Sequence, residues 1–242
     1  MTFPFLSIVI PAYNEARRLP GTLEQLGAFC EVHPGEVEVL VVVEKSSDGT
    51  LDLARKSAEG RVCWKVIAND DHRGKGYAVR CGMLQARGDL LFFMDADLSV
   101  PLEEIVAFAR FLQENPGVDL LFGSRKHPES RIIRRQSRLR EQMGEAFNAV
   151  VRRLAGIGIR DTQCGFKAFR RAAAQAIFSR QELDGFAFDV EICLLAQRLG
   201  LQVEERPLEW RDEPDSRVQI VRDSFRMLCD VVAIKRRFSR LP

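Results

Sequence analysis

Two carboxylates one residue apart, Asp95 and Asp97, follow the apolar run at residues 90–94. Such a run is typical of a buried strand, and a carboxylate buried there without a partner costs on the order of several kcal/mol. The pair must therefore meet water, a cation or hydrogen-bond donors. Mg²⁺ and Mn²⁺ prefer carboxylate and phosphate oxygens, so a divalent ion that joins the pair to a diphosphate explains the arrangement. The alternative is that Asp97 caps a helix that starts near Pro101, while Asp95 takes no part in chemistry.

A polar, turn-forming segment, Pro-Ala-Tyr-Asn-Glu at residues 11–15, follows the first apolar run of the chain. Here Tyr13 can stack on a nucleobase and Glu15 can contact the edge of the base. The alternative is an ordinary turn from strand to helix, in which Asn14 is the cap and Glu15 interacts with the helix dipole.

A second polar segment, residues 70–76, opens a helix and contains Gly74-Lys75-Gly76. It offers a phosphate backbone N–H groups, the positive end of a helix and the Lys75 ammonium. Val79 stands where a dinucleotide fingerprint needs its third glycine, which disfavours a Rossmann oxidoreductase.

The elements that position these residues alternate between short β-branched runs and helical segments. This pattern predicts an α/β fold, a mostly parallel central sheet with helices on both faces. We expect strands at 6–11, 37–43, 62–68, 90–94 and 118–123, and helices at 15–32, 49–58, 74–86, 101–114 and 141–154. Ligands in open α/β sheets bind beyond the carboxyl ends of the strands. The part of the chain after Gly123 is expected to fold onto that edge.

Composition excludes several classes of protein. The 242 residues are 46% hydrophobic and 29% charged, which is ordinary for a soluble globular protein. No apolar run approaches the ~20 residues of a membrane span. The six cysteines form no Cys-x-x-Cys pair, so we expect reduced core thiols and no zinc site. The N-terminus shows no signal peptide, which predicts a cytoplasmic protein, and a net charge of +2 argues against nucleic-acid binding.

Positive charge is concentrated in two stretches. Residues 125–140 contain seven basic residues and one acidic residue, and residues 217–242 contain seven and two. If the first stretch is helical, Arg134 and Arg138 lie one turn apart. Any single arginine there is explained by a solvated surface, but clustered arginines make bidentate contacts with phosphate. We therefore predict a phosphate site at Arg131, Arg134, Arg135 and Arg138.

The second basic stretch also contains an apolar stripe at helical spacing. The stripe consists of Val218, Val221, Phe225, Leu228 and Val232. The basic residues beside or beyond it are Arg222, Arg226, Lys235, Arg236, Arg237 and Arg240. Such a helix can lie on an anionic membrane surface, or its stripe can pack on the core of the protein while the basic tail is solvated. Both alternatives stay open.

Together the motifs resemble the family 2 glycosyltransferases of the GT-A fold, and the second half narrows the resemblance to the dolichyl-phosphate glucosyltransferase-like branch. The segments that carry the resemblance are 7–15, 74–76 with 87–89, 95–99, 123–125, 160–167, 185–191 and 210–214. The resemblance implies a GT-A domain over 1–216, with a nucleotide-binding half at 1–123 and an acceptor-binding half at 124–216. A basic amphipathic helix at 217–242 follows.

The resemblance also implies roles for single residues. Asp95 and Asp97 would hold the diphosphate through Mg²⁺ or Mn²⁺, Arg125 would face the acceptor phosphate, and Asp189 and Glu191 would lie beside the acceptor and the sugar. Binding of the nucleotide sugar would involve Pro11, Tyr13, Glu15, Glu44, Lys75, Asp95 and Ala96. Many relatives have Asp-Asp-Gly-Ser after the second strand, whereas this chain keeps only one acid there, Glu44. The identity of the donor's nucleobase therefore stays open.

The implied reaction is the inverting transfer of glucose from UDP-glucose to a polyprenyl or dolichyl phosphate, by an enzyme that is cytoplasmic or peripheral at the cytoplasmic membrane face. A phosphomonoester has a second pKa of about 6, so it can attack the anomeric carbon without a general base. Asp189 or Glu191 would be a base only for a hydroxyl acceptor, and otherwise would fix the following helix. The alternatives are a GDP-mannose-dependent mannosyltransferase and a non-catalytic module that binds a nucleotide or a lipid phosphate. A sugar-nucleotide pyrophosphorylase is disfavoured, because its Gly-rich signature is missing after the first strand.

Overall fold

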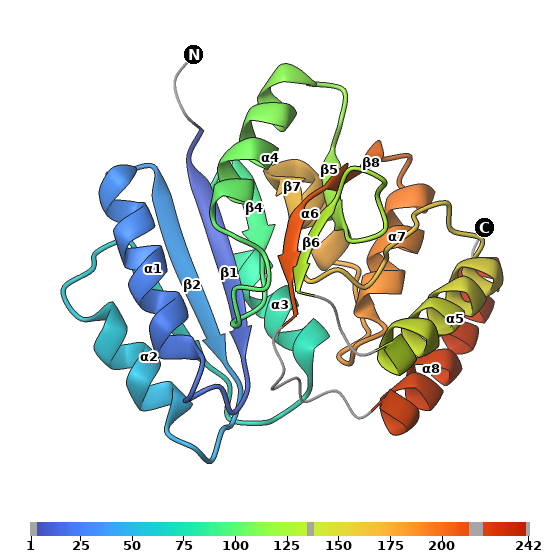
Figure 1. The fold of residues 1–242 in the computed structure, drawn as a ribbon, viewed down its shortest axis with the longest axis horizontal. Helices are drawn as coiled ribbons and strands as arrows, with labels where there is room; N and C mark the ends of the chain where they lie inside the picture. Colours follow the sequence, from blue (N-terminus) through green and yellow to red (C-terminus); the bar gives the residue numbers. More distant parts are fainter. Residues whose placement is uncertain (1–3, 135–137, 213–219, 241–242) are drawn as a thin grey trace.

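A seven-stranded sheet forms the centre of the protein (Figure 1). The computed structural model describes residues 4–134, 138–212 and 220–240. Within them the strand order is β3-β2-β1-β4-β7-β5-β8. The strands are β1 Leu6–Ala12, β2 Val37–Val43, β3 Trp64–Ala68, β4 Leu90–Phe93, β5 Leu120–Ser124, β7 Lys167–Arg170 and β8 Val203–Pro207. The predicted α/β fold is confirmed.

The strands β1, β2 and β4 are parallel and buried. All seven residues of β2 are buried, as are all four of β4. Continuous runs of Val, Ile, Leu and Phe form such strands because helices cover both faces of the sheet. The register pairs Ala12 with Val43 and Val9 with Phe93, so the carboxyl ends of the three strands meet at one edge, at the bottom in Figure 1.

The second half of the chain adds two strands to the same sheet. β7 lies antiparallel between β4 and β5, and β8 lies parallel beside β5. The two predicted halves therefore share one sheet. A separate pair is formed by β6 Arg131–Arg134 and β9 Glu209–Arg211. A helix that contains both Arg134 and Arg138 is therefore wrong, because Arg134 is the last residue of β6 and helix α5 (Arg138–Ala155) begins only at Arg138.

Helices cover both faces of the sheet and enclose two hydrophobic cores. On one face lie α1 Leu19–Val32, α2 Thr50–Ala58 and α4 Glu103–Glu114. On the other face lie α3 Lys75–Gln85, α5 Arg138–Ala155, α6 Arg171–Phe178, α7 Phe188–Arg198 and α8 Ile220–Arg240. Neighbouring residues of one strand serve opposite cores, since Ile8 belongs to the first and Val9 to the second.

The C-terminal helix α8 lies beside α5 at one side of the molecule (Figure 1). Among its described side chains, Met227, Val231 and Ile234 are buried, and Leu228 packs against the same core. Val232, in the predicted stripe, is instead 37% exposed. The side chains of Val218, Val221 and Phe225 lie outside the described residues. Among the helices that the structure describes, none combines the length and apolar character of a membrane span.

The cysteines are unpaired in the structure, but not all of them are core residues. Cys164 and Cys193 are buried, whereas Cys63 and Cys229 are exposed. Burial raises the pKa of the Cys164 thiol to about 12, which leaves it protonated and inert. The expectation of core thiols therefore holds for part of the set and is wrong for the two exposed residues.

Candidate active site

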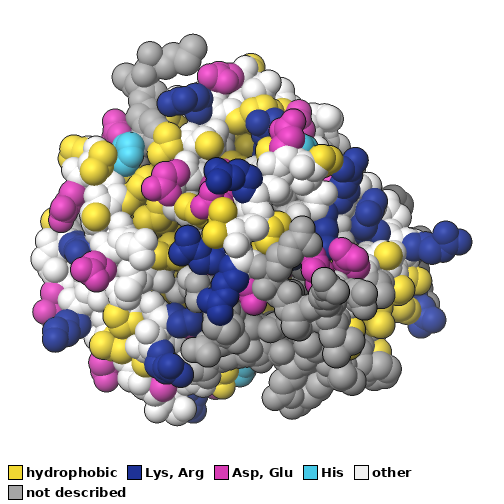
Figure 2. Space-filling model, viewed as in Figure 1, with side chains coloured by type: hydrophobic (Ala, Val, Ile, Leu, Met, Phe, Trp, Pro, Cys, Tyr) yellow, Lys and Arg dark blue, Asp and Glu magenta, His cyan; other side chains and the backbone are white. Residues whose placement is uncertain are grey.

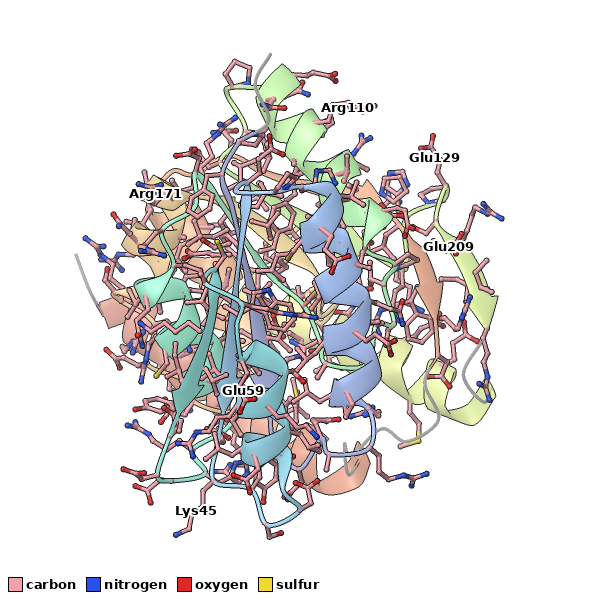
Figure 3. The ribbon with its side chains drawn as sticks, turned by 90° about the vertical axis from the view of Figure 1, so that its left-hand side faces the viewer. Lys45, Glu59, Arg110, Glu129, Arg171 and Glu209 are labelled. Atoms are coloured by element: carbon pink, nitrogen blue, oxygen red, sulfur yellow. The ribbon has the colours of Figure 1, made fainter. Side chains whose placement is uncertain are left out.

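A cavity of about 200 Å³ opens at the carboxyl edge of β1, β2 and β4. In Figure 3, the label of Lys45, which follows β2, lies at this end of the molecule, and the label of Arg110 lies at the opposite end. The cavity is lined by Asp97 and by all the residues predicted to bind a nucleotide sugar: Pro11, Tyr13, Glu15, Glu44, Lys75, Asp95 and Ala96. Its other lining residues, which the sequence analysis missed, are Ala12, Arg18, His72, Ala78 and Phe186.

Asp95 lies directly after β4 and faces a cation. Its Oδ1 is 2.6 Å from Nζ of Lys75, at the start of α3. Burial alone would lower the pKa of Lys75, but the combined attraction of Asp95, Asp189 and Asp97 outweighs burial and raises the pKa. The other side of the Asp95 carboxylate lies against Gly165, where a Cβ atom would collide with it. A glycine at 165 therefore keeps Asp95 in place.

Asp97 organises the turn that leads toward α4. Its Oδ1 accepts hydrogen bonds from the backbone N–H (3.0 Å) and the hydroxyl (2.6 Å) of Ser99, and its Oδ2 is 3.5 Å from Nη1 of Arg18. Leu98, between them, has φ of +52°, which costs a non-glycine residue about 1 kcal/mol. The predicted helix cap is in fact a turn cap, since α4 begins only at Glu103. Strain of this kind concentrates at functional sites.

Glu44 is buried behind the loop that opens α3. Its carboxylate is 2.6 Å from Nδ1 of His72 and accepts the backbone N–H groups of Arg73 (3.1 Å) and Gly74 (2.9 Å). Glu44 therefore positions the 72–74 loop as well as lining the cavity. Only 2% of the residue is exposed, so most of its hydrogen-bonding capacity is already used by the protein.

Tyr13 already has a stacking partner in the protein. Its ring lies on the imidazole of His72 with centroids 3.6 Å apart and an interplanar angle of 6°. Glu15 is likewise engaged, because Nε of Arg18 donates to its Oε2 at 2.7 Å. The cavity wall is thus built from paired side chains. A lone His in a polar loop carries no sequence signal that would have revealed these contacts.

The carboxylate pair fits a divalent ion that shares its ligands with a substrate. Within the described part of the chain, no group of three or more His, Cys, Asp or Glu side chains could hold a metal on its own. Asp95 and Asp97 nevertheless line the same cavity, and a smaller hollow beside both is lined by Ser99 and Gly165. Mg²⁺ is commonly bound by one or two carboxylates together with substrate phosphates, so these residues fit an ion that arrives with a diphosphate.

A fully buried ion pair lies behind the cavity. Nζ of Lys167 is 2.6 Å from Oδ1 of Asp189 and donates to the carbonyl of Cys164 at 2.6 Å. Burial raises the pKa of Asp189, and attraction to Lys167 and Lys75 offsets only part of this effect. Asp189 is 3% exposed and does not line the cavity, although it lies close enough to Lys75 and Asp95 for their charges to interact.

Glu191, the second candidate base, is also enclosed. It has no exposed surface, and its carboxylate accepts the backbone N–H groups of Glu182 and Leu183. Nη2 of Arg237 lies 2.8 Å from the same carboxylate. The geometry agrees with the structural alternative, in which Glu191 fixes the start of α7.

Arg125 is held by a partner that the sequence analysis did not identify. Its Nε and Nη2 donate to the two oxygens of Asp161 at 2.8 and 2.9 Å, and its backbone N–H donates to Oδ2 at 2.9 Å. Burial alone would raise the pKa of Asp161, but Arg125 outweighs burial and holds the pKa below its usual value. Arg125 does not line the cavity, so contact with an acceptor phosphate stays a prediction.

The predicted phosphate cluster is only partly described. Arg131 and Arg134 are exposed at the two ends of β6, and Arg131 lies 3.6 Å from Glu209 on β9. Glu129 and Glu209 lie on this side of the molecule in Figure 3. The side chains of Arg135 and Arg138 lie outside the described residues. Figure 2 shows further Lys and Arg side chains along the side that α5 and α8 occupy.

Comparison with known proteins gives a consistent result. A family model described as glycosyl transferase family 2 matches residues 7–178. The dolichyl-phosphate beta-glucosyltransferase of Drosophila melanogaster is 36% identical over 226 residues, which cover 88% of this chain and 69% of that protein. The protein of the same name from Saccharomyces cerevisiae is 33% identical over 247 residues, which cover 96% of this chain and 74% of that protein.

Two solved structures share the fold. Mannosyl-3-phosphoglycerate synthase from Rubrobacter xylanophilus matches with a TM-score of 0.70 and 23% identity, over 99% of this chain and 76% of that one. Glucosyl-3-phosphoglycerate synthase from Mycobacterium tuberculosis, in complex with Mg²⁺ and UDP, matches with a TM-score of 0.63 and 21% identity, over 95% and 80% of the two chains. At these identities the likeness shows the fold alone.

Proposed function

Because the chain belongs to glycosyl transferase family 2, in the branch that contains the dolichyl-phosphate glucosyltransferases, we propose that it transfers glucose from UDP-glucose to a dolichyl or polyprenyl phosphate. The observation that carries the proposal is the cavity at the carboxyl edge of the sheet. It gathers the Asp95 and Asp97 carboxylates, the Lys75 ammonium, the Arg18 guanidinium and the Tyr13 ring around a volume of about 200 Å³. This set of groups suits a nucleoside diphosphate and a divalent cation.

The diphosphate would lie between Lys75 and the carboxylate pair. Lys75 is the first residue of α3, so the positive end of the helix adds to its ammonium charge. Asp95 and Asp97 would hold Mg²⁺ or Mn²⁺, and the neighbour crystallised with Mg²⁺ and UDP supports this choice of ion. The ion would supply positive charge that stabilises the departing nucleoside diphosphate.

The acceptor phosphate would supply its own nucleophile. An oxygen of the dianion attacks the anomeric carbon from the side opposite the nucleotide, and the bond from that carbon to the diphosphate oxygen breaks, which inverts the configuration. No proton has to be removed, because the phosphomonoester is already largely dianionic at neutral pH. The enclosure of Asp189 and Glu191 supports a reaction that does without a general base.

The acceptor side of the proposal rests on the basic stretch. Exposed Arg131 and Arg134, together with Arg135 and Arg138, would attract the lipid phosphate, and Asp161 would hold Arg125 in the orientation that the site needs. We assign nucleotide binding to 1–123 and acceptor binding to 124–216. The basic residues of 217–242 would attract an anionic membrane from the cytoplasmic side.

A transfer assay tests the proposal. The full chain is incubated with short-chain polyprenyl phosphate and, in separate reactions, UDP-glucose, UDP-galactose or GDP-mannose, each with Mn²⁺ or with EDTA. We expect a glycolipid product from UDP-glucose with metal, and none when the matched neutral polyprenol replaces the phosphate. Product from GDP-mannose alone would identify a mannosyltransferase, and nucleotide binding without any transfer would identify a binding module. Either outcome contradicts the proposal.

A further inference from the structure

The segment between α6 and α7, residues 181–186, borders the donor cavity, and its last two residues begin the 185–191 motif. Phe186, at its end, lines the cavity. Gln181 is buried, and its side-chain amide donates to the carbonyl of Gly76 in the first turn of α3 at 3.1 Å. The segment is therefore packed directly against the part of α3 that carries Lys75.

The packing between this segment and the start of α3 leaves no space. A Cβ atom at Gly74 would collide with the backbone carbonyl of Asp184, and one at Gly76 would collide with that of Leu183. The N–H of Tyr77 donates to the Asp184 carbonyl at 3.1 Å. Any displacement of the 181–186 segment must therefore move the α3 start, and with it the ammonium that meets Asp95.

Charged side chains strengthen the same contact. The Asp184 carboxylate accepts hydrogen bonds from Arg73 at 2.9 and 2.6 Å and from Arg80 at 3.1 Å. Arg73 lies in the loop that Glu44 holds, and Arg80 lies one turn further along α3. The segment and the α3 start thus form one unit on the cavity side.

On its other side the segment is held by Glu191 and the C-terminal helix. The fully buried Glu191 carboxylate accepts the N–H of Glu182 at 3.0 Å and that of Leu183 at 2.7 Å. Arg237 of α8 donates to the same carboxylate at 2.8 Å with one nitrogen, and its other terminal nitrogen contacts the Glu182 side chain. This guanidinium is the cation that faces the buried carboxylate in the described structure.

We propose that Glu191 and Arg237 are positioning residues for the donor site: they hold the 181–186 segment, and through it Lys75 and Phe186, in the geometry that binds the nucleoside diphosphate. The inference rests on the proposed function, since it concerns the same cavity. Loss of Arg237 leaves a buried carboxylate without its cation, so the segment shifts to admit water. Lys75 then moves with it.

The test measures binding of UDP with Mn²⁺ to the full chain by isothermal titration calorimetry, which needs no acceptor. Arg237→Ala is compared with Arg236→Ala, a matched control at the exposed neighbouring residue of the same helix. We expect Arg237→Ala to weaken UDP binding by roughly tenfold, a size typical of mutations that act through a connected network. Arg236→Ala should bind UDP as the unmodified chain does.

Steady-state kinetics separate positioning from general destabilisation. Arg237→Ala should raise the KM for the donor while the KM for the acceptor stays unchanged, and Arg237→Lys should restore part of the donor affinity. Glu191→Gln, which keeps an acceptor for one N–H group but loses the ion pair, should have the same direction of effect.

Two outcomes overturn the inference. The first is a folded Arg237→Ala protein that binds UDP with unchanged affinity. The second is an equal loss in Arg236→Ala, which would mean that only the positive charge of the helix matters. If Arg237→Ala does not fold, Glu191→Gln decides by the same titration. Failure of the unmodified chain to bind UDP would instead refute the proposed function.

Discussion

Lys167 lies in the middle of the sheet with no exposed surface, and its removal gives a quantitative test of the structure. The ammonium pairs with Asp189 at 2.6 Å, and the two side chains are 0% and 4% exposed. Solvent therefore does not screen the pair. Lys167→Met keeps a long apolar chain in place but leaves the Asp189 carboxylate buried without its strongest partner. Breaking a buried ion pair in this way costs about 3–5 kcal/mol of unfolding free energy.

Smaller losses accompany the main one. The carbonyl of Cys164 loses a hydrogen bond worth about 1 kcal/mol, and the ammonium also lies 5.1 and 4.7 Å from the ring centroids of Phe93 and Phe122. The total stays near 3–5 kcal/mol because Asp189 can take up a proton, which limits the electrostatic penalty. Replacement of both partners, in Lys167→Met with Asp189→Leu, should recover most of the loss.

The loss should depend on pH in a defined direction. The pKa of Asp189 is already raised by burial, and removal of Lys167 raises it further. A carboxyl group whose folded pKa lies above its unfolded pKa binds more protons in the folded state over that interval, so stability falls as pH rises through it. The deficit of Lys167→Met is therefore largest at neutral pH and decreases as the pH is lowered.

Urea denaturation followed by circular dichroism measures these differences at pH 7 and pH 5. Lys45→Met, at an exposed lysine after β2, is the matched control and should change stability by less than about 0.5 kcal/mol. A loss below about 1 kcal/mol in Lys167→Met would refute the reasoning. So would a double variant whose loss equals the sum of the two single losses, because the pair would then contribute no coupling energy.

Three further changes test the site. Asp97→Asn should lower turnover on the order of a hundredfold or more with the fold intact, and EDTA should have a similar effect; full activity in EDTA contradicts the metal assignment. Gly165→Ala should push Asp95 aside and weaken Mn²⁺-dependent UDP binding, measured by calorimetry, with a smaller effect on stability. The lowered pKa of Asp161 means that its contribution to stability is present above the unfolded value of about 3.9 and is lost as pH falls through the folded value. The stability difference between the unmodified chain and Asp161→Asn should therefore shrink below about pH 4, and a constant difference would argue against the shift.

Most of the first half of the fold can be predicted from the sequence, because its strands are continuous apolar runs. The predicted strands at 6–11, 37–43 and 90–94 match β1, β2 and β4 to within one residue. The sequence analysis did not predict β7 and β8, and the reason is physical. β7 is four residues long and contains a buried lysine, and β8 reads Val-Glu-Glu-Arg-Pro at the edge of the sheet. Both are strands because of pairing with remote segments, which local sequence does not encode.

The same distinction applies to the cavity. Residues that directly follow β1, β2 and β4 were predicted, because the end of a strand fixes where they lie. Arg18, His72 and Phe186 were missed, because packing between separate loops brings them to the cavity. One signal was available in the sequence. Gly74 and Gly76 flank Lys75, and two glycines so close to a helix start indicate a close backbone approach, which here is made by the 181–186 segment.

In the basic stretch at residues 125–140, a strand stands where a helix was considered, yet the prediction of a phosphate site at its arginines is unaffected. Arg131–Arg134 encloses Ile132 and Ile133, and adjacent β-branched residues favour a strand over a helix. A regular strand would send Arg131 and Arg134 to opposite faces. The pairing with β9 has an irregularity between Ile132 and Arg134, and such a bulge re-aims the side chain that follows it. Arg134 is exposed, as Arg131 is, while Ile132 packs against the core. The bulge therefore leaves both arginines exposed to solvent, as a helical turn would have done, and their contact with an acceptor phosphate stays a prediction.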